Sequence, residues 1–181
     1  GLEANFIEGD AEFLPYEDQK FDVVVSQYGH MFAPRPEVVT NELARVLKTG
    51  GTLAFSTWPK ELFMGKFFKL IEDFSLPLPA EVASPVLWGD MTIIQERLEH
   101  QFEKIEFGRD TMYAPTMSPA HMLKLFEKNA GPLSNLVKAL GDDPTKLTEL
   151  RNSALDLIRK FFSNNYLRQD FLMTRCIKKS S

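Results

Sequence analysis

Two short apolar runs predict neighbouring strands in the first third of the chain. Residues 23–25 and residues 53–55 are continuously apolar rather than alternating. This pattern is typical of strands that helices cover on both faces. One helix between two such strands needs a full crossover, which predicts parallel pairing with a right-handed connection.

The helix between these strands has clear start and end signals. Pro36 suits the first turn of a helix, where its missing N–H costs nothing. Lys48 is expected in the last turn, and Gly50 in a left-handed capping conformation. The apolar stripe falls at helical spacing, on Val39, Leu43, Val46 and Leu47.

The remainder of the chain predicts further helices and two more strands. A helix carries apolar residues at 3- and 4-residue spacing between Phe63 and Phe74, and residues 76–85 form a proline-rich loop. Asp90 is a plausible N-cap for the next helix. Residues 101–107 alternate and predict a strand, and residues 171–177 predict another.

A helical insertion is expected between these last two strands. Their separation is far longer than a hairpin loop, so the intervening chain needs structure of its own. Ser118-Pro119 opens a first helix, Pro132 a short second one, and residues 146–162 have the most regular apolar spacing. We therefore expect a single partial domain over residues 1–181, with a helical insertion at residues 111–165.

Composition narrows the range of partners. A net charge of −4 argues against a nucleic-acid-binding surface. No apolar run approaches the roughly 20 residues of a membrane span, and no secretory leader is recognised. The single Cys176 excludes an internal disulfide, and the three histidines lack metal-ligand spacing. A cytoplasmic protein without a metal site is expected.

The most informative local motif is Gly9-Asp10-Ala11, followed by the apolar run at residues 23–25. The carboxylate of Asp10 can accept a hydrogen bond from the exocyclic amine of an adenine ring. The backbone N–H of Ala11 can donate to a ring nitrogen, and a bulkier side chain there would displace the base. Taken alone the motif is weak, because Gly and Asp also end strands for turn reasons.

The segment around this motif resembles the class I S-adenosylmethionine-dependent methyltransferases, especially the branch typified by ubiquinone and menaquinone biosynthesis. Four pieces match in order. Residues 6–11 resemble the family's third strand and adenine-binding turn, and residues 21–26 its fourth strand. Residues 41–48 resemble the next helix, and residues 50–55 the turn into strand five. Thr49 departs from the family, which usually has proline there.

The resemblance implies an α/β fold with a Rossmann-like methyltransferase sheet that is partial, holding strands three to seven of the family. The family's first strand ends in a Gly-rich turn and its second in an acid for the ribose. The ten glycines of this chain include no Gly-x-Gly. The chain is therefore expected to be a fragment, the C-terminal part of a methyltransferase with half of the cofactor site, and to be inactive alone.

The missing strands also create an expectation about the sheet. In the family order 3-2-1-4-5-7-6, the strand at residues 6–8 and the strand at residues 23–25 have no partners between them. Exposed apolar strand edges attract other chains. We expect that residues 6–8 move in beside residues 23–25, that a second copy fills the gap, or that upstream residues exist.

Candidate cofactor contacts lie at the carboxyl end of the predicted strand at residues 21–26. The resemblance implies cofactor binding by Gly9, Asp10 and Ala11. Ligands of open α/β sheets bind beyond the carboxyl ends of strands, which favours five further residues in or after this strand. Four of these are proposed cofactor neighbours and one, His30, is a candidate general base; the alternative is a plain turn with an exposed histidine. The residues are Ser26, Gln27, Tyr28, His30 and Met31.

Candidate acceptor-binding residues are aromatic or sulfur-containing. The resemblance places Trp58, Met112 and Tyr113 after strands, where the family often builds its acceptor pocket, and Trp88 is a lid or core candidate. Asp22 begins its strand, so a structural role is favoured over catalysis. Methyl transfer needs few side chains, because the sulfonium is already an activated donor and alignment with water exclusion supplies much of the rate.

Two functions from different classes follow. The first is methyl transfer from S-adenosylmethionine to a small apolar or aromatic acceptor in the intact protein. The alternative is a non-catalytic α/β module for interaction or assembly. The presence or absence of an upstream strand ending in an acidic, Gly-rich turn discriminates between them.

Overall fold

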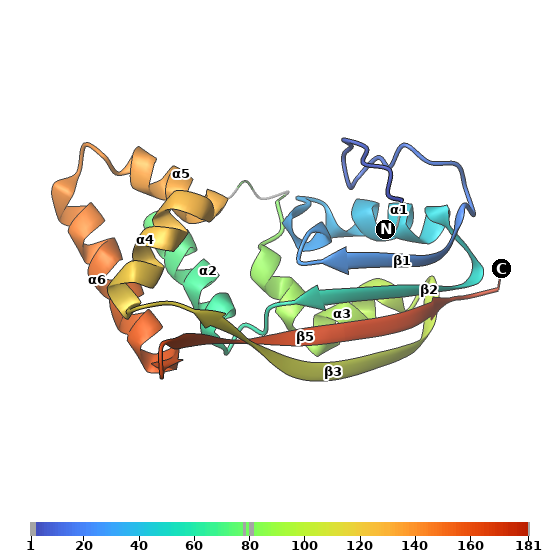
Figure 1. The fold of residues 1–181 in the computed structure, drawn as a ribbon. Helices are drawn as coiled ribbons and strands as arrows, with labels where there is room; N and C mark the ends of the chain where they lie inside the picture. Colours follow the sequence, from blue (N-terminus) through green and yellow to red (C-terminus); the bar gives the residue numbers. More distant parts are fainter. Residues whose placement is uncertain (1–2, 78, 80–81, 181) are drawn as a thin grey trace.

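A computed structural model describes residues 3–77, 79 and 82–180. Four strands form one sheet in the order β1 (Phe21–Gln27), β2 (Leu47–Thr57), β5 (Tyr166–Lys178) and β3 (Phe102–Pro115). A two-residue strand, β4 (Phe162–Ser163), also pairs with β5. Figure 1 shows β3 and β5 continuing well beyond β1 and β2 toward a group of helices.

The pairing follows the predicted topology. β1 and β2 are parallel, with Val24 opposite Leu53, whereas β5 is antiparallel to both β2 and β3. This order equals the 4-5-7-6 part of the sheet that the resemblance implies. The predicted parallel crossover and the predicted antiparallel pair are both confirmed.

Helices cover one face of the sheet. α1 (Pro36–Val46) packs on β2, and α3 (Met91–Leu98) packs on β3. The side chains beneath them, such as Leu53 and Cys176, are fully buried. On the opposite face Val23 and Val25 are 56% and 70% exposed. The prediction that helices cover both faces of residues 23–25 is therefore wrong, because no described segment lies against that face.

A second group of helices surrounds the far ends of β3 and β5. It contains α2 (Phe63–Phe74), α4 (Pro119–Asn129), α5 (Gly131–Ala139) and α6 (Pro144–Phe161). Caps define several starts as predicted: Ser118 Oγ accepts from the N–H of His121, and Asp90 Oδ1 caps α3 through the N–H of Thr92. An aromatic cluster joins α2, α4 and α6, formed by Phe63, Phe67, Phe126 and Phe161.

Two 3₁₀ turns, η1 (His30–Phe32) and η2 (Pro85–Gly89), connect the sheet with the helices. Gly89, the last residue of η2, lies very close to the backbone that follows β2. A Cβ added there would lie 1.9 Å from the carbonyl oxygen of Trp58, just after the end of β2. Only glycine fits this contact without moving backbone.

Several predicted boundaries differ from the structure. α1 ends at Val46, so Lys48 and Gly50 lie in β2 rather than in a helix cap, although Gly50 has the expected positive φ of 75°. Those extra residues form an irregularity in the β1–β2 pairing. β3 extends to Pro115, so the helices of the insertion occupy only Pro119–Phe161. Within the predicted loop at residues 76–85, residues 78 and 80–81 lie outside the described residues.

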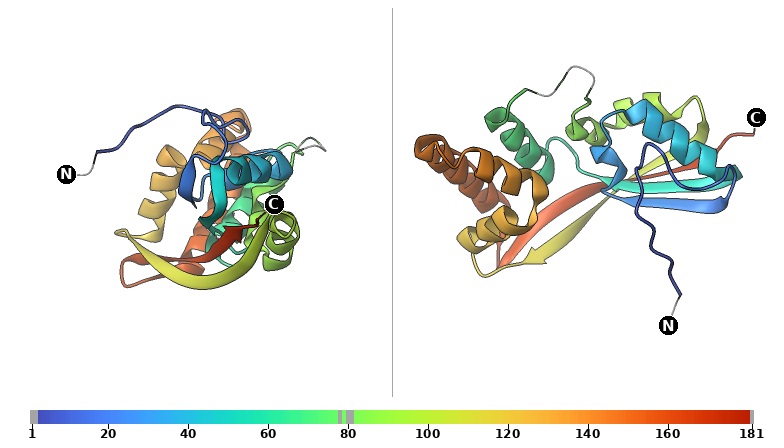
Figure 2. Two further views of the ribbon diagram at one scale, coloured as in Figure 1. Left: turned by 90° about the vertical axis from the view of Figure 1, so that its right-hand side faces the viewer. Right: turned by 90° about the horizontal axis from the view of Figure 1, so that it is seen from above.

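The predicted strand at residues 6–8 does not form. The segment is extended but unpaired, and Phe6 is 95% exposed. Figure 2 shows this N-terminal arm pointing away from the sheet. The expectation that residues 6–8 move in beside residues 23–25 is therefore wrong, since β1 remains an edge strand.

None of the helices in the described ranges is long and apolar enough to cross a bilayer.

Candidate functional site

The carboxyl end of β1 turns sharply at Tyr28. This residue has a positive φ of 56°, which is uncommon for a bulky side chain. Its N–H donates to the carbonyl of Ser56 on β2, at 3.2 Å. Backbone held in such a conformation often marks a ligand-binding or catalytic position. Tyr28 therefore marks the point where the two parallel strands end together.

Tyr28 stacks flat on Trp58, which follows β2. The ring centroids are 3.9 Å apart with an interplanar angle of 5°, and Trp58 is only 5% exposed. Burial raises the pKa of the Tyr28 phenol. Trp58 is thus a buried core residue whose ring is covered by Tyr28.

His30 lies inside the protein. It is 3% exposed, between the rings of Phe55 and Trp88. Burial lowers the pKa of its imidazole to about 4, with a further lowering by the charge of Arg97. The ring is therefore neutral at pH 7, and the predicted alternative of an exposed loop histidine is wrong.

The hydrogen bonds of His30 lead back to β1. Its Nδ1 lies 2.9 Å from Ser26 Oγ, and its backbone N–H donates to the same oxygen at 3.1 Å. His30 thus fixes the side chain of Ser26 at the carboxyl end of β1. The neighbouring Met31 is 1% exposed and belongs to the core, whereas Gln27 is exposed.

The Gly9-Asp10-Ala11 motif forms a tight turn. Asp10 Oδ1 accepts from the N–H of Glu12 at 2.9 Å, and the Asp10 carbonyl accepts from the N–H of Phe13 at 3.0 Å. Asp10 is exposed. The motif therefore forms the kind of turn that Gly and Asp commonly make at strand ends. This turn leaves the acidic side chain at the surface.

An ion pair places this turn beside the carboxyl end of β1. Arg35, just before α1, donates through Nε to Glu12 Oε2 at 2.8 Å, and its backbone N–H donates to Glu12 Oε1 at 2.7 Å. The hydrogen bond from the Arg35 side chain lowers the pKa of Glu12. Because Arg35 lies between η1 and α1, the pair ties the turn to the segment that leaves the carboxyl end of β1.

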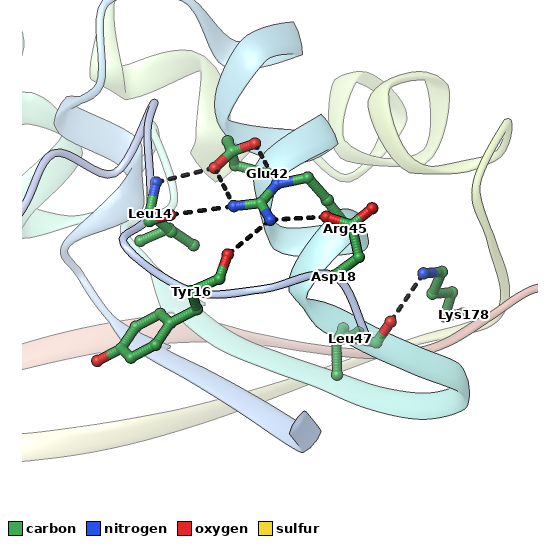
Figure 3. Close-up of polar contacts among 7 residues, drawn as sticks. All are labelled: Leu14, Tyr16, Asp18, Glu42, Arg45, Leu47 and Lys178. Atoms are coloured by element: carbon green, nitrogen blue, oxygen red, sulfur yellow. Dashed lines mark hydrogen bonds and ion pairs between the residues drawn. The ribbon is translucent and has the colours of Figure 1, made fainter. Parts of the chain in front are cut away.

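A second anchor holds the segment between this turn and β1 (Figure 3). Arg45 of α1 donates to the carbonyl oxygens of Leu14 and Tyr16 and to Asp18, at distances of 3.0, 2.7 and 2.8 Å. Glu42 accepts from the N–H of Leu14 at 2.8 Å. Hydrogen bonds from Arg45 lower the pKa of Glu42. We call Glu42 and Arg45 the α1 clamp.

Both anchors were missed by the sequence analysis. Glu42 and Arg45 stand three residues apart, the spacing at which helix side chains meet, so their mutual ion pair could have been found. Their bonds to Leu14 and Tyr16 could not, since backbone acceptors leave no mark in the side-chain sequence. The pairing of Glu12 with Arg35 could not be predicted either, because the two residues are 23 positions apart and belong to no common helix or strand.

Two predicted acceptor residues lie away from these groups. Met112 and Tyr113 lie inside β3, so the expectation that they follow a strand is wrong. β2 ends at Thr57 opposite Leu172, whereas Met112 lies opposite Gln169. Three residues of extended chain separate these positions along β5, about 10 Å. Tyr113 is 61% exposed and meets Tyr166 edge-on.

Known proteins share the fold of this chain. Residues 1–55 match the methyltransferase domain family. A solved structure of a SAM-dependent methyltransferase from Thermotoga maritima superimposes with a TM-score of 0.53 at 17% identity, over 96% of this chain and 63% of that chain. The fold is that of the Rossmann-like methyltransferases.

Relatives in sequence are longer than this chain. An uncharacterized protein of Mycobacterium tuberculosis is 29% identical over 174 residues, which cover 96% of this chain and 64% of the relative. A fatty-acid O-methyltransferase of Mycolicibacterium smegmatis is 41% identical over 56 residues, covering 31% of this chain and 20% of the relative. The chain thus spans just under two thirds of the mycobacterial relative that it matches along its length.

Proposed function

We propose that this chain forms the adenine-binding and acceptor-binding side of a methyltransferase that moves a methyl group from S-adenosylmethionine to a small apolar or aromatic acceptor. The supporting observation is the anchored turn at Asp10 and Ala11, which the ion pair between Glu12 and Arg35 ties to the segment that follows the carboxyl end of β1. The ubiquinone and menaquinone branch remains the finer proposal.

The groups present fit the adenine part of this cofactor. Among the described residues Asp10 Oδ2 and the N–H of the half-buried Ala11 have no hydrogen-bond partner, so consecutive residues of the turn offer an acceptor and a donor. Gly9 keeps the turn narrow, since a Cβ there would lie 3.1 Å from Pro15 Cδ. When bound, S-adenosylmethionine supplies the activated methyl group.

Other predicted cofactor neighbours have more restricted roles in this proposal. Ser26, Gln27 and Tyr28 border the methionine part of the cofactor, with the Ser26 hydroxyl held by His30. Met31 contributes packing below them, because its side chain is buried. His30 acts as a positioning residue, since its neutral ring bonds to Ser26 inside the protein rather than facing a substrate.

The proposal requires groups that residues 1–181 lack. A Gly-rich turn and an acid for the ribose hydroxyls would complete the cofactor site. We propose that residues outside the present 181 supply them, as the greater length of the mycobacterial relative permits. Methyl transfer would then belong to the longer protein, with this chain as a fragment of it.

The uncovered face of β1 favours a second candidate function. Val23 and Val25 expose apolar side chains on an unpaired edge strand, a surface that favours association with another chain. A non-catalytic assembly module would use this face without binding S-adenosylmethionine.

Replacement of one carboxylate tests the first proposal. In a form of the protein that includes the Gly-rich segment, Asp10→Ala should raise the dissociation constant for S-adenosylmethionine about tenfold or somewhat more, through loss of one hydrogen bond to a carboxylate. Asp22→Ala is the matched control. Asp22 lies at the opposite end of β1 and pairs with Lys48, so its removal should leave the dissociation constant unchanged.

Calorimetry gives the dissociation constants, and circular dichroism confirms the fold of both variants. An unchanged affinity in folded Asp10→Ala would remove this residue from the site.

A further inference from the structure

An apolar cavity opens beside the turn that follows β1. Its volume is about 330 Å³, within the range of small-molecule sites. η1, η2, α5 and the C-terminal part of α2 with the residues that follow it contribute its walls. The apolar residues of these walls are Phe32, Phe68, Ile71, Leu76, Pro85 and Pro132.

A second cavity adjoins this one. The second cavity has a volume of about 760 Å³ and lies between α2, α5 and α6. Three residues, Ser75, Leu76 and Pro132, line both cavities. Leu76 stands at their junction and is 89% exposed. We call the two cavities together the α2 cleft.

The first cavity is tied to the candidate cofactor site. Phe32 ends η1, directly after His30 and Met31, and its ring meets that of Phe68 edge-on at 5.6 Å. The carbonyl of Pro34 accepts from the N–H of Ala83, at 3.0 Å. The cleft therefore begins at the segment that leaves the carboxyl end of β1.

Most polar groups of the α2 cleft are engaged with protein partners, whereas Asn135 and Glu149 of the second cavity have no side-chain partner among the described residues. Glu72 accepts a hydrogen bond from the Ser84 hydroxyl, Asp73 pairs with Lys69, and Lys146 approaches Asp143 at 3.9 Å. A charged ligand group would have to compete with these partners. The walls around Leu76 instead offer apolar contact, which rewards an uncharged hydrocarbon group.

We propose that the α2 cleft binds the uncharged alkyl chain of the methyl acceptor. The chain would enter past Phe32, lie across Leu76 and end between α2 and α5. Two adjoining cavities with shared apolar residues between them suit an elongated ligand better than a compact one. This inference rests on the proposed function, yet binding of the alkyl chain needs no cofactor.

A fluorescent probe tests the cleft in the 181-residue chain itself. N-phenyl-1-naphthylamine is neutral and fluoresces in apolar surroundings, and decan-1-ol should displace it competitively. Leu76→Glu should weaken binding of the probe and of decan-1-ol at least tenfold, because it places a carboxylate between the two cavities. Leu76→Met should keep both affinities within about twofold. The exposure of Leu76 makes unfolding of these variants unexpected, and circular dichroism checks it.

Two matched variants locate the probe. Met91→Glu changes another exposed apolar residue, 43% exposed on α3, and should leave binding unchanged. Val25→Glu alters the uncovered face of β1 and should also leave it unchanged. Binding that is lost in Val25→Glu but kept in Leu76→Glu would overturn the proposal, as would failure of decan-1-ol to displace the probe. Loss of S-adenosylmethionine binding in Asp10→Ala bears on the cofactor site alone.

Discussion

The burial of His30 affects the pKa of its imidazole ring. The imidazole sits between Phe55 and Trp88 and bonds to Ser26, so a proton on its ring would have to enter a poorly solvated space. Its pKa falls to about 4 in the folded protein from an ordinary value of 6.5. As pH falls below 6.5, the unfolded chain takes up the proton first, and folding therefore becomes less favourable until the pH reaches about 4.

This linkage predicts the pH dependence of stability. Between pH 7 and pH 5, the wild type should lose about 2 kcal/mol more of its free energy of unfolding than His30→Leu loses. Urea denaturation at both pH values measures the two differences. His100→Gln changes an exposed histidine and should retain the wild-type loss. Equal losses in wild type and His30→Leu would show that His30 does not bind its proton in this way.

The residues of the site could be anticipated only in part. The Gly9-Asp10-Ala11 motif and the strand end at Ser26, Gln27 and Tyr28 could be proposed from the sequence, because each group consists of consecutive residues. The burial of His30 was not visible, because Trp88 and Phe55 reach it from elements that lie 58 and 25 residues further along. Polar residues near a strand end give no sign of such distant covering.

At the scale of elements, caps and apolar spacing were dependable signals. Pro36, Asp90 and Ser118 mark helix starts within one residue of those observed. Strand lengths were harder, because the outer half of β3 carries charged and exposed residues that interrupt the alternation, such as Asp110. The strand at residues 6–8 was predicted from resemblance, but its pairing depends on partners that this chain does not contain.

Two glycines give a matched test of packing between elements. Gly89→Ala should reduce the free energy of unfolding by at least about 2 kcal/mol, since the new Cβ meets the Trp58 carbonyl and backbone must move. Gly108→Ala, on β3, places its Cβ in open space and should be neutral or slightly stabilising. Thermal or urea unfolding compares them. A neutral Gly89→Ala would mean that η2 can withdraw from β2 without cost.

At the scale of the whole molecule, the sheet is covered on one face and bare along β1. Val23 and Val25 belong to a strand whose outer edge has no partner among the described residues. The apolar run at residues 23–25 predicted two covering layers of helices, and among the described residues one layer is present. Composition and periodicity could not predict the uncovered face of β1. An apolar pattern indicates that a side chain favours burial, but it does not indicate which segment covers that side chain.

Self-association is the expected result for the isolated chain. Apolar side chains on an unpaired strand favour edge-to-edge contact, and a charge placed there opposes it. Val25→Lys should shift sedimentation toward monomer at concentrations where the wild type associates, whereas Met117→Lys, at a residue 75% exposed after β3, should not. A wild type that remains monomeric at high concentration would contradict this expectation.

Affinity for the cofactor is also a property of the whole molecule. The 181-residue chain offers Asp10 and Ala11 but neither a Gly-rich turn nor a ribose-binding acid. Several missing hydrogen bonds, each worth roughly 1–3 kcal/mol, should weaken S-adenosylmethionine binding by several orders of magnitude. Calorimetry should therefore detect no binding at micromolar concentrations. A micromolar dissociation constant for this chain would show that the remaining contacts suffice.

The α1 clamp has a consequence for how this protein can vary. Arg45 donates hydrogen bonds to the carbonyl oxygens of Leu14 and Tyr16, and Glu42 accepts one from the N–H of Leu14. Almost every amino acid has these backbone groups. In turn, the carbonyl of Arg45 receives the N–H of Gln19. Apart from the ion pair between Arg45 and Asp18, these contacts are made to backbone atoms, so the helix holds the segment largely independently of its side chains. Most residues between the turn at Asp10 and β1 can therefore change while the segment keeps its place, provided that Glu42 and Arg45 are retained.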